Sequence, residues 1–193
     1  MYSRQIIKRG NERMITVDLE SDLLQNRILF ITGIIDDETA STYQAELIYL
    51  ANQITGDKSK SPIKIYINSP GGELYSSFGL YDVIRKLIDQ GYIIQTKVIG
   101  LAASAAAFIL LSGSKGYRSA TPHSRIMIHQ PSSGTYGTVT DMKIDLEESV
   151  AMKEEFINVI NKHCEHDLSD LIERDKWLSP TAAKELGLID IIK

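Results

Sequence analysis

Cysteine is nearly absent from this 193-residue chain, and no apolar run is long enough to span a membrane. The one cysteine, Cys164, excludes an intramolecular disulfide, which fits a reducing compartment. It has no CxxC partner, so we interpret it as a structural thiol. The longest apolar run, residues 99–111, is too short for a bilayer. Residues 1–10 lack the apolar core of a secretory signal, so we expect a cytoplasmic protein.

Excess positive charge is absent as well. The formal net charge of −4 argues against general affinity for nucleic acid or anionic membranes. Neither GxGxxG nor GxxxxGK[ST] occurs, which argues against these phosphate-binding loops. With 43% hydrophobic and 24% charged residues, the composition is typical of a globular domain, and the length suits one domain over residues 1–193.

Three stretches of the sequence read as a strand followed by a helix. The predicted pairs are residues 27–31 with 37–53, 64–67 with 76–87, and 93–100 with a helix opening near Ser104. Asp36 or Asp37 is the expected cap of the first helix. A further strand is predicted at 124–128, and a helix capped by Ser179 near the end of the chain. Repeated βα units predict an α/β fold with a parallel sheet.

Residues 139–162 have the periodicity of one long helix. A helix of this length needs a surface to pack against. It either projects toward a partner subunit or folds back on its own domain, and the sequence favours neither. The preceding segment, residues 132–138, is rich in Gly, Ser and Thr and is either a loop or an edge ribbon.

Ser104 stands where a strand-like run gives way to a helix-like run of small residues. A serine at this point lies beside the free N–H groups of a helix start, which stabilise an oxyanion. By itself such a serine is more often only a cap. A nucleophilic role requires a base, and His129 ends an apolar strand at the same edge of the sheet, where ligands bind in open α/β folds. A capping imidazole is the alternative for His129.

The remaining histidines and the acids give weaker signals. His163 and His166 form a possible metal pair, but no third ligand is evident and a solvated surface is the favoured reading. An imidazole base needs a carboxylate to orient it, and Asp175, next to Trp177, is one candidate among 25 acids that spacing cannot distinguish. We expect Trp177 to keep water from this acid.

Two consecutive glycines, Gly71 and Gly72, follow the predicted strand 64–67. They allow backbone to approach a substrate or to present an N–H to an oxyanion. A tight turn is an equally good interpretation, because the sequence from Asn68 to Gly72 is rich in residues that end strands.

Several motifs in order resemble ClpP, the proteolytic subunit family of the ATP-dependent Clp proteases. They cover nearly the whole chain: YINSPGG at 66–72, GLAASA at 100–105, RIMIHQP at 125–131, ERDKWLS at 173–179 and ELGLID at 185–190. RILFITG at 27–33 also resembles the first strand of the family. The resemblance implies a ClpP/crotonase-like fold of repeated β-β-α and βα units, with a protruding handle of a strand and a long helix over residues 130–165.

The resemblance also implies the site. It assigns a Ser-His-Asp triad to Ser104, His129 and Asp175, and an oxyanion hole to the N–H groups of Gly72 and Ala105. Gly71, Glu73 and Pro131 match substrate-binding positions. The implied activity is a serine endopeptidase that cleaves short peptides and unfolded proteins through an acyl-enzyme. No metal and no cofactor is implied, because ATP is used by the partner unfoldase.

The same resemblance implies the assembly. Two stacked heptameric rings would form a homo-tetradecamer, with Gln130, Asp141 and Arg174 at ring-to-ring contacts and residues 1–20 forming an axial segment. The partner would be an AAA+ unfoldase such as ClpX, ClpA or ClpC. The docking surface is atypical, because polar residues replace the usual apolar ones while Tyr66 remains; these are Lys64, Lys86, Lys97, Thr121 and Lys193.

Two other functions are compatible with parts of the pattern. A crotonase-fold enzyme acting on an acyl-CoA thioester would use paired backbone N–H groups without needing all three triad residues. A non-catalytic ring subunit, or a specialised one with an atypical partner, would keep the assembly and lose or alter the activity. The complete set of Ser104, His129 and Asp175 argues against an inactive subunit.

Overall fold

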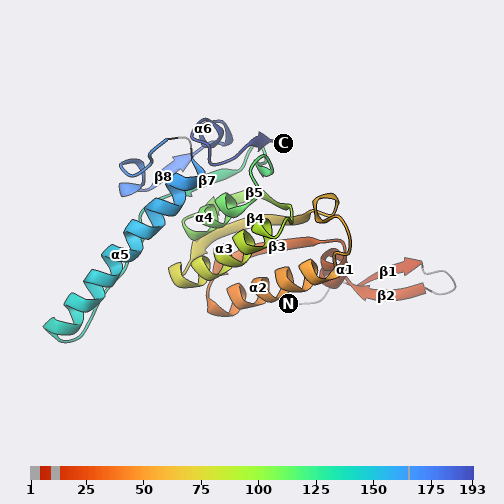
Figure 1. Ribbon diagram of the computed structural model, residues 1–193, viewed down its shortest axis with the longest axis horizontal. Coiled ribbons are helices and arrows are strands. Elements are labelled where there is room, and N and C mark those ends of the chain that lie inside the picture. Colours follow the sequence, from red (N-terminus) through yellow and green to blue (C-terminus); the bar gives the residue numbers. More distant parts are fainter. Residues whose placement is uncertain (1–4, 10–13, 165) are drawn as a thin grey trace.

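The body of the protein is a seven-stranded sheet flanked by helices (Figure 1). The computed structural model describes residues 5–9, 14–164 and 166–193. The strands of the sheet are β3 (Ile28–Ile35), β4 (Ile63–Gly72), β5 (Ile94–Ala103), β6 (Arg118–Ala120), β7 (Arg125–Ile128), β8 (Lys176–Leu178) and β9 (Ile191–Ile192). Their order is β3-β4-β5-β6-β9, and β7 pairs with β5 and β8. Only the β7–β8 pairing is antiparallel within this sheet, so the predicted parallel α/β architecture is confirmed.

The helices begin largely where the sequence predicts. They are α1 (Leu19–Gln25), α2 (Asp37–Gln53), α3 (Leu74–Asp89), α4 (Ala105–Ser112), α5 (Val139–His163) and α6 (Pro180–Glu185), with two 3-10 turns, η1 (Lys58–Lys60) and η2 (Leu171–Glu173). Asp36 caps α2, accepting from the Thr39 N–H at 2.9 Å, and Ser179 caps α6. Both caps satisfy N–H groups that lack partners inside the helix.

Helix α4 occupies the centre of the core. All eight of its residues are buried, and it packs against α3, α5, β4, β5 and β7. A helix that is apolar on every side is stable only when neighbours surround it, which explains its run of Ala, Phe, Ile and Leu. Its N-terminus, and therefore the residue before it, is held rigidly by this packing.

Two strands extend further than predicted. The sequence places their ends at Ile67 and Gly100, but β4 continues to Gly72 and β5 to Ala103. The residues that usually end strands are instead accommodated by shifts in register, one between Ile67 and Ser69 on β4. The carboxyl ends of β4 and β5 consequently lie together at one edge of the sheet.

The short strands β6 and β8 were not predicted. Each has three residues, too few for a visible alternation of apolar and polar side chains. Strand β6 pairs with the first half of β5 and β7 with the second half, so the sheet forks after β5. The fork brings β7 and its end beside the start of α4.

Helix α5 projects from the body (Figure 1). Its buried residues, Phe156, Val159 and Ile160, all lie in its C-terminal third, whereas apolar side chains of the outer part are exposed, among them Leu146 at 61%. The helix therefore does not fold back on its own domain.

The segment before α5 contains no strand, so the predicted strand of the handle is absent from the isolated chain. Residues 132–138 instead run beside the helix, with Ser133 bonded to Ser149 at 2.9 Å and Thr135 to Asp145. The physical reason is the lack of a neighbouring strand: a ladder requires a second backbone, and side-chain bonds to a helix cannot supply one.

The predicted N-terminal segment is only partly described. β1 (Gln5–Arg9) and β2 (Met14–Asp18) form an antiparallel hairpin at the end of the molecule away from α5 (Figure 1). Residues 1–4 and 10–13 of the predicted 1–20 segment lie outside the described residues. Within the described ranges, we find no helix with the length and hydropathy that a membrane span requires.

Candidate active site

Ser104 lies at the junction of β5 and α4 in a conformation that few residues other than glycine adopt. Its φ is 54° and its ψ is −124°. Such a conformation costs of the order of 1–3 kcal/mol and persists only where the surroundings enforce it. Here the buried helix α4 follows directly, and the Ser104 N–H donates to the carbonyl of Met127 at 2.9 Å. These contacts hold Ser104 beside the end of β7.

His129 follows β7 and contacts both predicted partners. Its Nε2 lies 2.8 Å from the Ser104 hydroxyl, and its Nδ1 lies 3.0 Å from Oδ1 of Asp175. The antiparallel pairing of β7 with β8 matches Ile128 to Lys176, which places the residue before β8 next to the residue after β7. The structure thus brings together three residues that sequence spacing alone could not connect.

Solvent reaches the His129 and Asp175 side chains of this hydrogen-bonded series. The His129 side chain is 25% exposed, and that of Asp175 is 63% exposed. The prediction that Trp177 excludes water from Asp175 is wrong for the isolated chain, because Trp177 is itself half exposed on β8. Among the described strands, β8 pairs with β7 alone, so no second strand covers the indole.

Gly71 lies directly against the start of α4, and Gly72 lies against Ile35 of β3. A Cβ on Gly71 would fall 2.8 Å from the Ala105 nitrogen and 2.5 Å from the Ala103 carbonyl oxygen. Gly71 also has a φ of +95°, which favours glycine. The next N–H, that of Glu73, donates to Ile35 of β3, so the N–H of Gly72 faces away from β3. This close approach excludes the simple tight-turn interpretation.

The N–H of Ala105 is one of the first four in α4 and has no acceptor inside the helix. This donor directly follows Ser104, and Gly71, the residue before Gly72, lies against Ser104, since an added Cβ would fall 2.9 Å from the Ser104 Cβ. The α4 N-terminus adds a partial positive charge beside Ser104. This arrangement can stabilise a negatively charged oxygen on a group bonded to Ser104.

Ser69 is a residue of this site that the sequence analysis missed. Its hydroxyl accepts from the Gly71 N–H at 3.0 Å and donates to the Gly33 carbonyl at 2.6 Å, and its side chain is buried. It therefore fixes the path of the two glycines. The sequence feature that could have identified Ser69 is its place two residues before Gly71, in a segment that was interpreted only as the end of a strand.

Of the predicted substrate-binding residues, Glu73 and Pro131 line a cavity of about 450 Å³ beside the Ser104 site, between the start of α3 and the side of α5. Gly71 lies deeper, against α4, and does not line it. Leu74, Val150 and Met152 give this cavity apolar walls.

Of the predicted ring-contact residues, Gln130 lies beside Glu173, the residue before Arg174, whereas Asp141 lies on the projecting helix α5. Gln130 donates through Nε2 to the carbonyl of Glu173 at 2.9 Å. The Asp141 carboxylate accepts from the hydroxyl of Thr138, the residue that caps α5. Among the described residues, neither Asp141 nor Arg174 forms an ion pair. The hydrogen bond from Lys153 holds the pKa of Glu173 below its ordinary value. The role of Gln130, Asp141 and Arg174 between rings stays a prediction.

The other histidines and the cysteine lie away from Ser104. His163 contradicts the solvated-surface interpretation: it is half-buried, and burial with nearby cations lowers its pKa to about 4. His166 is exposed as expected, and His123 is exposed as well. Burial raises the pKa of the Cys164 thiol to about 11, which fits a structural residue. No group of three potential metal ligands occurs in the part of the chain that the structure describes.

A parallel α/β sheet whose edge carries a strained serine, an imidazole, a carboxylate and free helix N–H groups defines the class of serine hydrolases. Comparison with known proteins is more specific. The model of the Clp protease family matches residues 10–193, and the chain belongs to that family. The predicted resemblance and fold class are confirmed.

Individual relatives agree with the family match. An ATP-dependent Clp protease proteolytic subunit of Bacteroides thetaiotaomicron is 40% identical over 188 residues, covering 96% of this chain and 82% of the relative. A protein of the same name from Bacteroides fragilis is also 40% identical, over 96% of this chain and 87% of its own. The protein of that name from Porphyromonas gingivalis is 37% identical, over 98% of this chain and 84% of its own.

Proposed function

We propose that the chain is the proteolytic subunit of an ATP-dependent Clp protease and cleaves peptide bonds as a serine endopeptidase through Ser104, His129 and Asp175. Family membership supports the activity. The observation that carries the residue assignment is the hydrogen-bonded series from the Ser104 hydroxyl through both ring nitrogens of His129 to Asp175. The serine is held in a strained conformation at a strand-to-helix junction, as in the nucleophile turn of other serine hydrolases.

The proposed mechanism follows from this geometry. Nε2 of His129 takes the proton of Ser104 as its oxygen attacks the scissile carbonyl, and Asp175 holds the imidazole and stabilises its charged form. The N–H groups of Gly72 and Ala105 bind the oxyanion. His129 then protonates the leaving amine, and water hydrolyses the acyl-enzyme by the reverse proton transfers. No metal or cofactor has a role in these steps.

Extended substrate would lie beside Gly71 and Glu73 and place a side chain in the cavity that Pro131 helps to line. Backbone pairing at a strand end gives affinity without strong sequence preference. We propose short peptides and unfolded proteins as substrates, the latter delivered by a AAA+ unfoldase that hydrolyses ATP itself.

Assembly into two stacked heptameric rings is part of the proposal. Helix α5 supports it, because it projects from the body with exposed apolar side chains that the chain itself leaves uncovered; they include Val139, Ile144, Leu146 and Val150. An ion pair between Asp141 and Arg174 would have to form between chains. An Arg174→Ala protein that assembles fully and has normal peptidase activity would exclude a coupling of assembly to Asp175 through this pair.

The proposed unfoldase surface retains part of an aromatic patch. Phe30 and Tyr66 stack with ring centroids 5.2 Å apart on neighbouring strands, and Lys97 is the register partner of Tyr66 on the next strand. Docking an apolar loop beside Lys97 requires its ammonium group to reach water. We therefore expect ClpX from another system to drive little degradation of a folded tagged protein. Robust degradation would exclude altered docking.

We also infer a cytoplasmic location. The support is Cys164, whose half-buried thiol has no partner for a disulfide in this chain and suits a reducing compartment.

A fluorophosphonate probe tests the function directly. It should label the protein on Ser104, and the protein should cleave small fluorogenic peptides. Ser104→Ala should abolish both signals, while Ser41→Ala, at an exposed position on α2, should change neither. Peptidase activity that survives in Ser104→Ala would overturn the assignment. An acyl-CoA enzyme of the same fold would give no Ser104 adduct, and a non-catalytic subunit would assemble without cleaving peptides.

A further inference from the structure

A second cavity, of about 580 Å³, lies at the far end of the helices that frame the active site. It is formed where the C-terminal parts of α3 and α5 meet the segment after α4 and the start of β5. Four cationic side chains line it, namely Arg85, Lys115, Arg118 and Lys162, together with His163. Among the described residues, the lining contains no acidic side chain.

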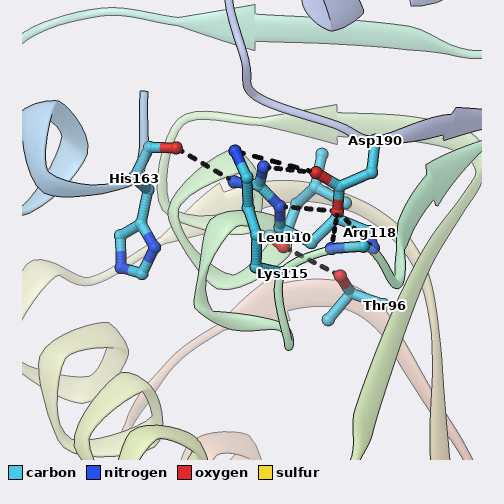
Figure 2. A network of polar contacts seen from close by, with 7 residues as sticks. Thr96, Leu110, Lys115, Arg118, His163 and Asp190 are labelled. Carbon is cyan, nitrogen blue, oxygen red and sulfur yellow. Dashed lines mark hydrogen bonds and ion pairs between the residues drawn. The ribbon is translucent and has the colours of Figure 1, made fainter. Parts of the chain in front are cut away.

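One carboxylate behind the wall balances part of this charge. Asp190 pairs with Arg118 through contacts of 2.7 and 3.0 Å and lies 3.9 Å from Lys115, as Figure 2 shows. Arg118 is only 1% exposed, so its charge is fixed in place. Arg85 and Lys162 have no ion-pair partner in the described part of the chain.

The C-terminal ends of helices offset a further part of the positive charge in the cavity. Arg85 donates to the carbonyl of Ser112 at 3.3 Å at the end of α4, and Arg118 donates to that of His163 at 3.3 Å at the end of α5. Each helix C-terminus carries about half a negative charge. With the end of α3, whose C-terminal residues Arg85 and Ile88 also line the cavity, these ends and Asp190 supply about two and a half negative charges against four positive ones. After the charges of Asp190 and of the helix ends are counted against the four cations, the cavity therefore keeps a positive potential.

His163 lies in the field of the same four cations. Burial and the charges of Arg85, Arg118, Lys115 and Lys162 lower its pKa to about 4. The imidazole is thus neutral at pH 7 and shares a 2.6 Å hydrogen bond with the hydroxyl of Tyr81. The acids Asp82, Asp89 and Glu155 influence that hydroxyl, but none of them lines the cavity.

We propose that this cavity binds a small organic molecule that carries a phosphate group. Arg85 and Lys162 would contact the phosphate, since they are the lining cations without a carboxylate partner. Tyr92, Ile88 and Ile93 form an apolar wall against which the organic part can lie. The volume is within the range of small-molecule sites, about 300–1,000 Å³, and exceeds what a bare phosphate needs.

The test is binding of AMP, with adenosine and phenyl phosphate as companion probes, measured by isothermal titration calorimetry at low salt. AMP should bind saturably to the full chain, adenosine at least tenfold more weakly, and added salt should weaken AMP binding. The variant Arg85→Gln/Lys162→Gln should bind AMP at least tenfold more weakly. Lys184→Gln, which removes an exposed cation of α6 outside the cavity, should bind like the parent protein.

Circular dichroism checks the folding of the variants, and peptide cleavage is not needed as a readout, because neither Arg85 nor Lys162 lies in the Ser104 site. If the double variant fails to fold, Lys162→Gln alone should still weaken binding severalfold, since Lys162 is exposed. The proposal is wrong if neither AMP nor phenyl phosphate binds saturably, if adenosine binds as well as AMP, or if the folded variants bind with unchanged affinity. A failure of peptidase activity leaves this binding result unaffected.

Discussion

The hydroxyl oxygen of Ser104 lies 2.8 Å from Nε2 of His129, although 25 positions of sequence separate the two residues. Both stand one residue beyond the end of neighbouring parallel strands, Ser104 after β5 and His129 after β7. The Ser104 N–H bond to Met127 fixes this register directly. Their contact is thus a consequence of strand pairing in the core and does not depend on a flexible loop.

Replacing Asp175 should test how much the imidazole depends on its carboxylate. Asp175→Asn removes the charge 3.0 Å from Nδ1 and favours the wrong tautomer of His129. We expect kcat for a fluorogenic peptide to fall by about 10²–10⁴-fold, with KM and the circular dichroism spectrum little changed. Asp170→Asn, at an exposed neighbour without a side-chain cap bond, should retain full activity. Equal activities for the two variants would remove Asp175 from the mechanism.

Gly71→Ala should damage the site more than a change at a comparable glycine. The added methyl group would meet the Ala103 carbonyl at 2.5 Å and the Ala105 nitrogen at 2.8 Å, both of them backbone atoms that cannot rotate away. Gly56, with a φ of +82° and no atom near the same position, is the matched control because it shares the backbone strain.

Strain from alanine at the positive φ of either glycine should lower stability by about 1–2 kcal/mol. Gly71→Ala should also reduce peptide cleavage by at least about 100-fold, because the oxyanion donors must move apart. Urea unfolding and steady-state kinetics on both variants separate these effects. A Gly71→Ala protein as active as Gly56→Ala would show that the glycine serves only the turn.

The sequence predicted the βα units, a cap at Asp36 or Asp37, of which Asp36 is the one observed, and the edge of the sheet that holds the site, because each rests on local periodicity or capping chemistry. The extension of β4 through Gly72 could not be predicted in this way. Asn68 there accepts a bond from the Leu101 N–H at 3.1 Å across the register shift, a contact made between strands 33 positions apart. Local propensity to end a strand was overridden by tertiary pairing.

The position of Asp175 illustrates the same limit. From composition it was one acid among 25, and only the family resemblance distinguished it. Its place next to His129 depends on the three-residue strand β8, which is too short to recognise. His163 was misjudged for a related reason: its sequence neighbours are polar, but the end of α5 packs against Tyr81 of α3.

Removing Asp190 should destabilise the fold strongly. The Arg118 side chain is 1% exposed, so Asp190→Asn would leave a buried guanidinium without its carboxylate. Burial alone would raise the pKa of Asp190, but its hydrogen bonds with Arg118 and the charge of that residue lower it. We expect a loss of about 3–5 kcal/mol in the free energy of unfolding. Lys60→Ala, which breaks an exposed pair with Asp57, should cost less than about 1 kcal/mol. Similar losses of unfolding free energy for Asp190→Asn and Lys60→Ala, measured by urea unfolding, would refute the expected difference between the buried and the exposed ion pair.

His163 should make the protein less stable in mild acid. Its pKa of about 4 lies below the ordinary value of 6.5, so the unfolded state takes up the proton first as the pH falls. Its contribution is therefore constant above about pH 6.5, and stability decreases between pH 6.5 and pH 4. Partial exposure reduces the full linkage energy to about 1–3 kcal/mol. The free energy of unfolding, compared at pH 7.5 and 4.5, should fall by this amount more in the parent protein than in His163→Gln. His166→Gln, at an exposed position, should keep the parent's pH dependence. If His163→Gln also keeps the pH dependence of the parent protein, the imbalance of positive charge around the imidazole is too weak to affect folding.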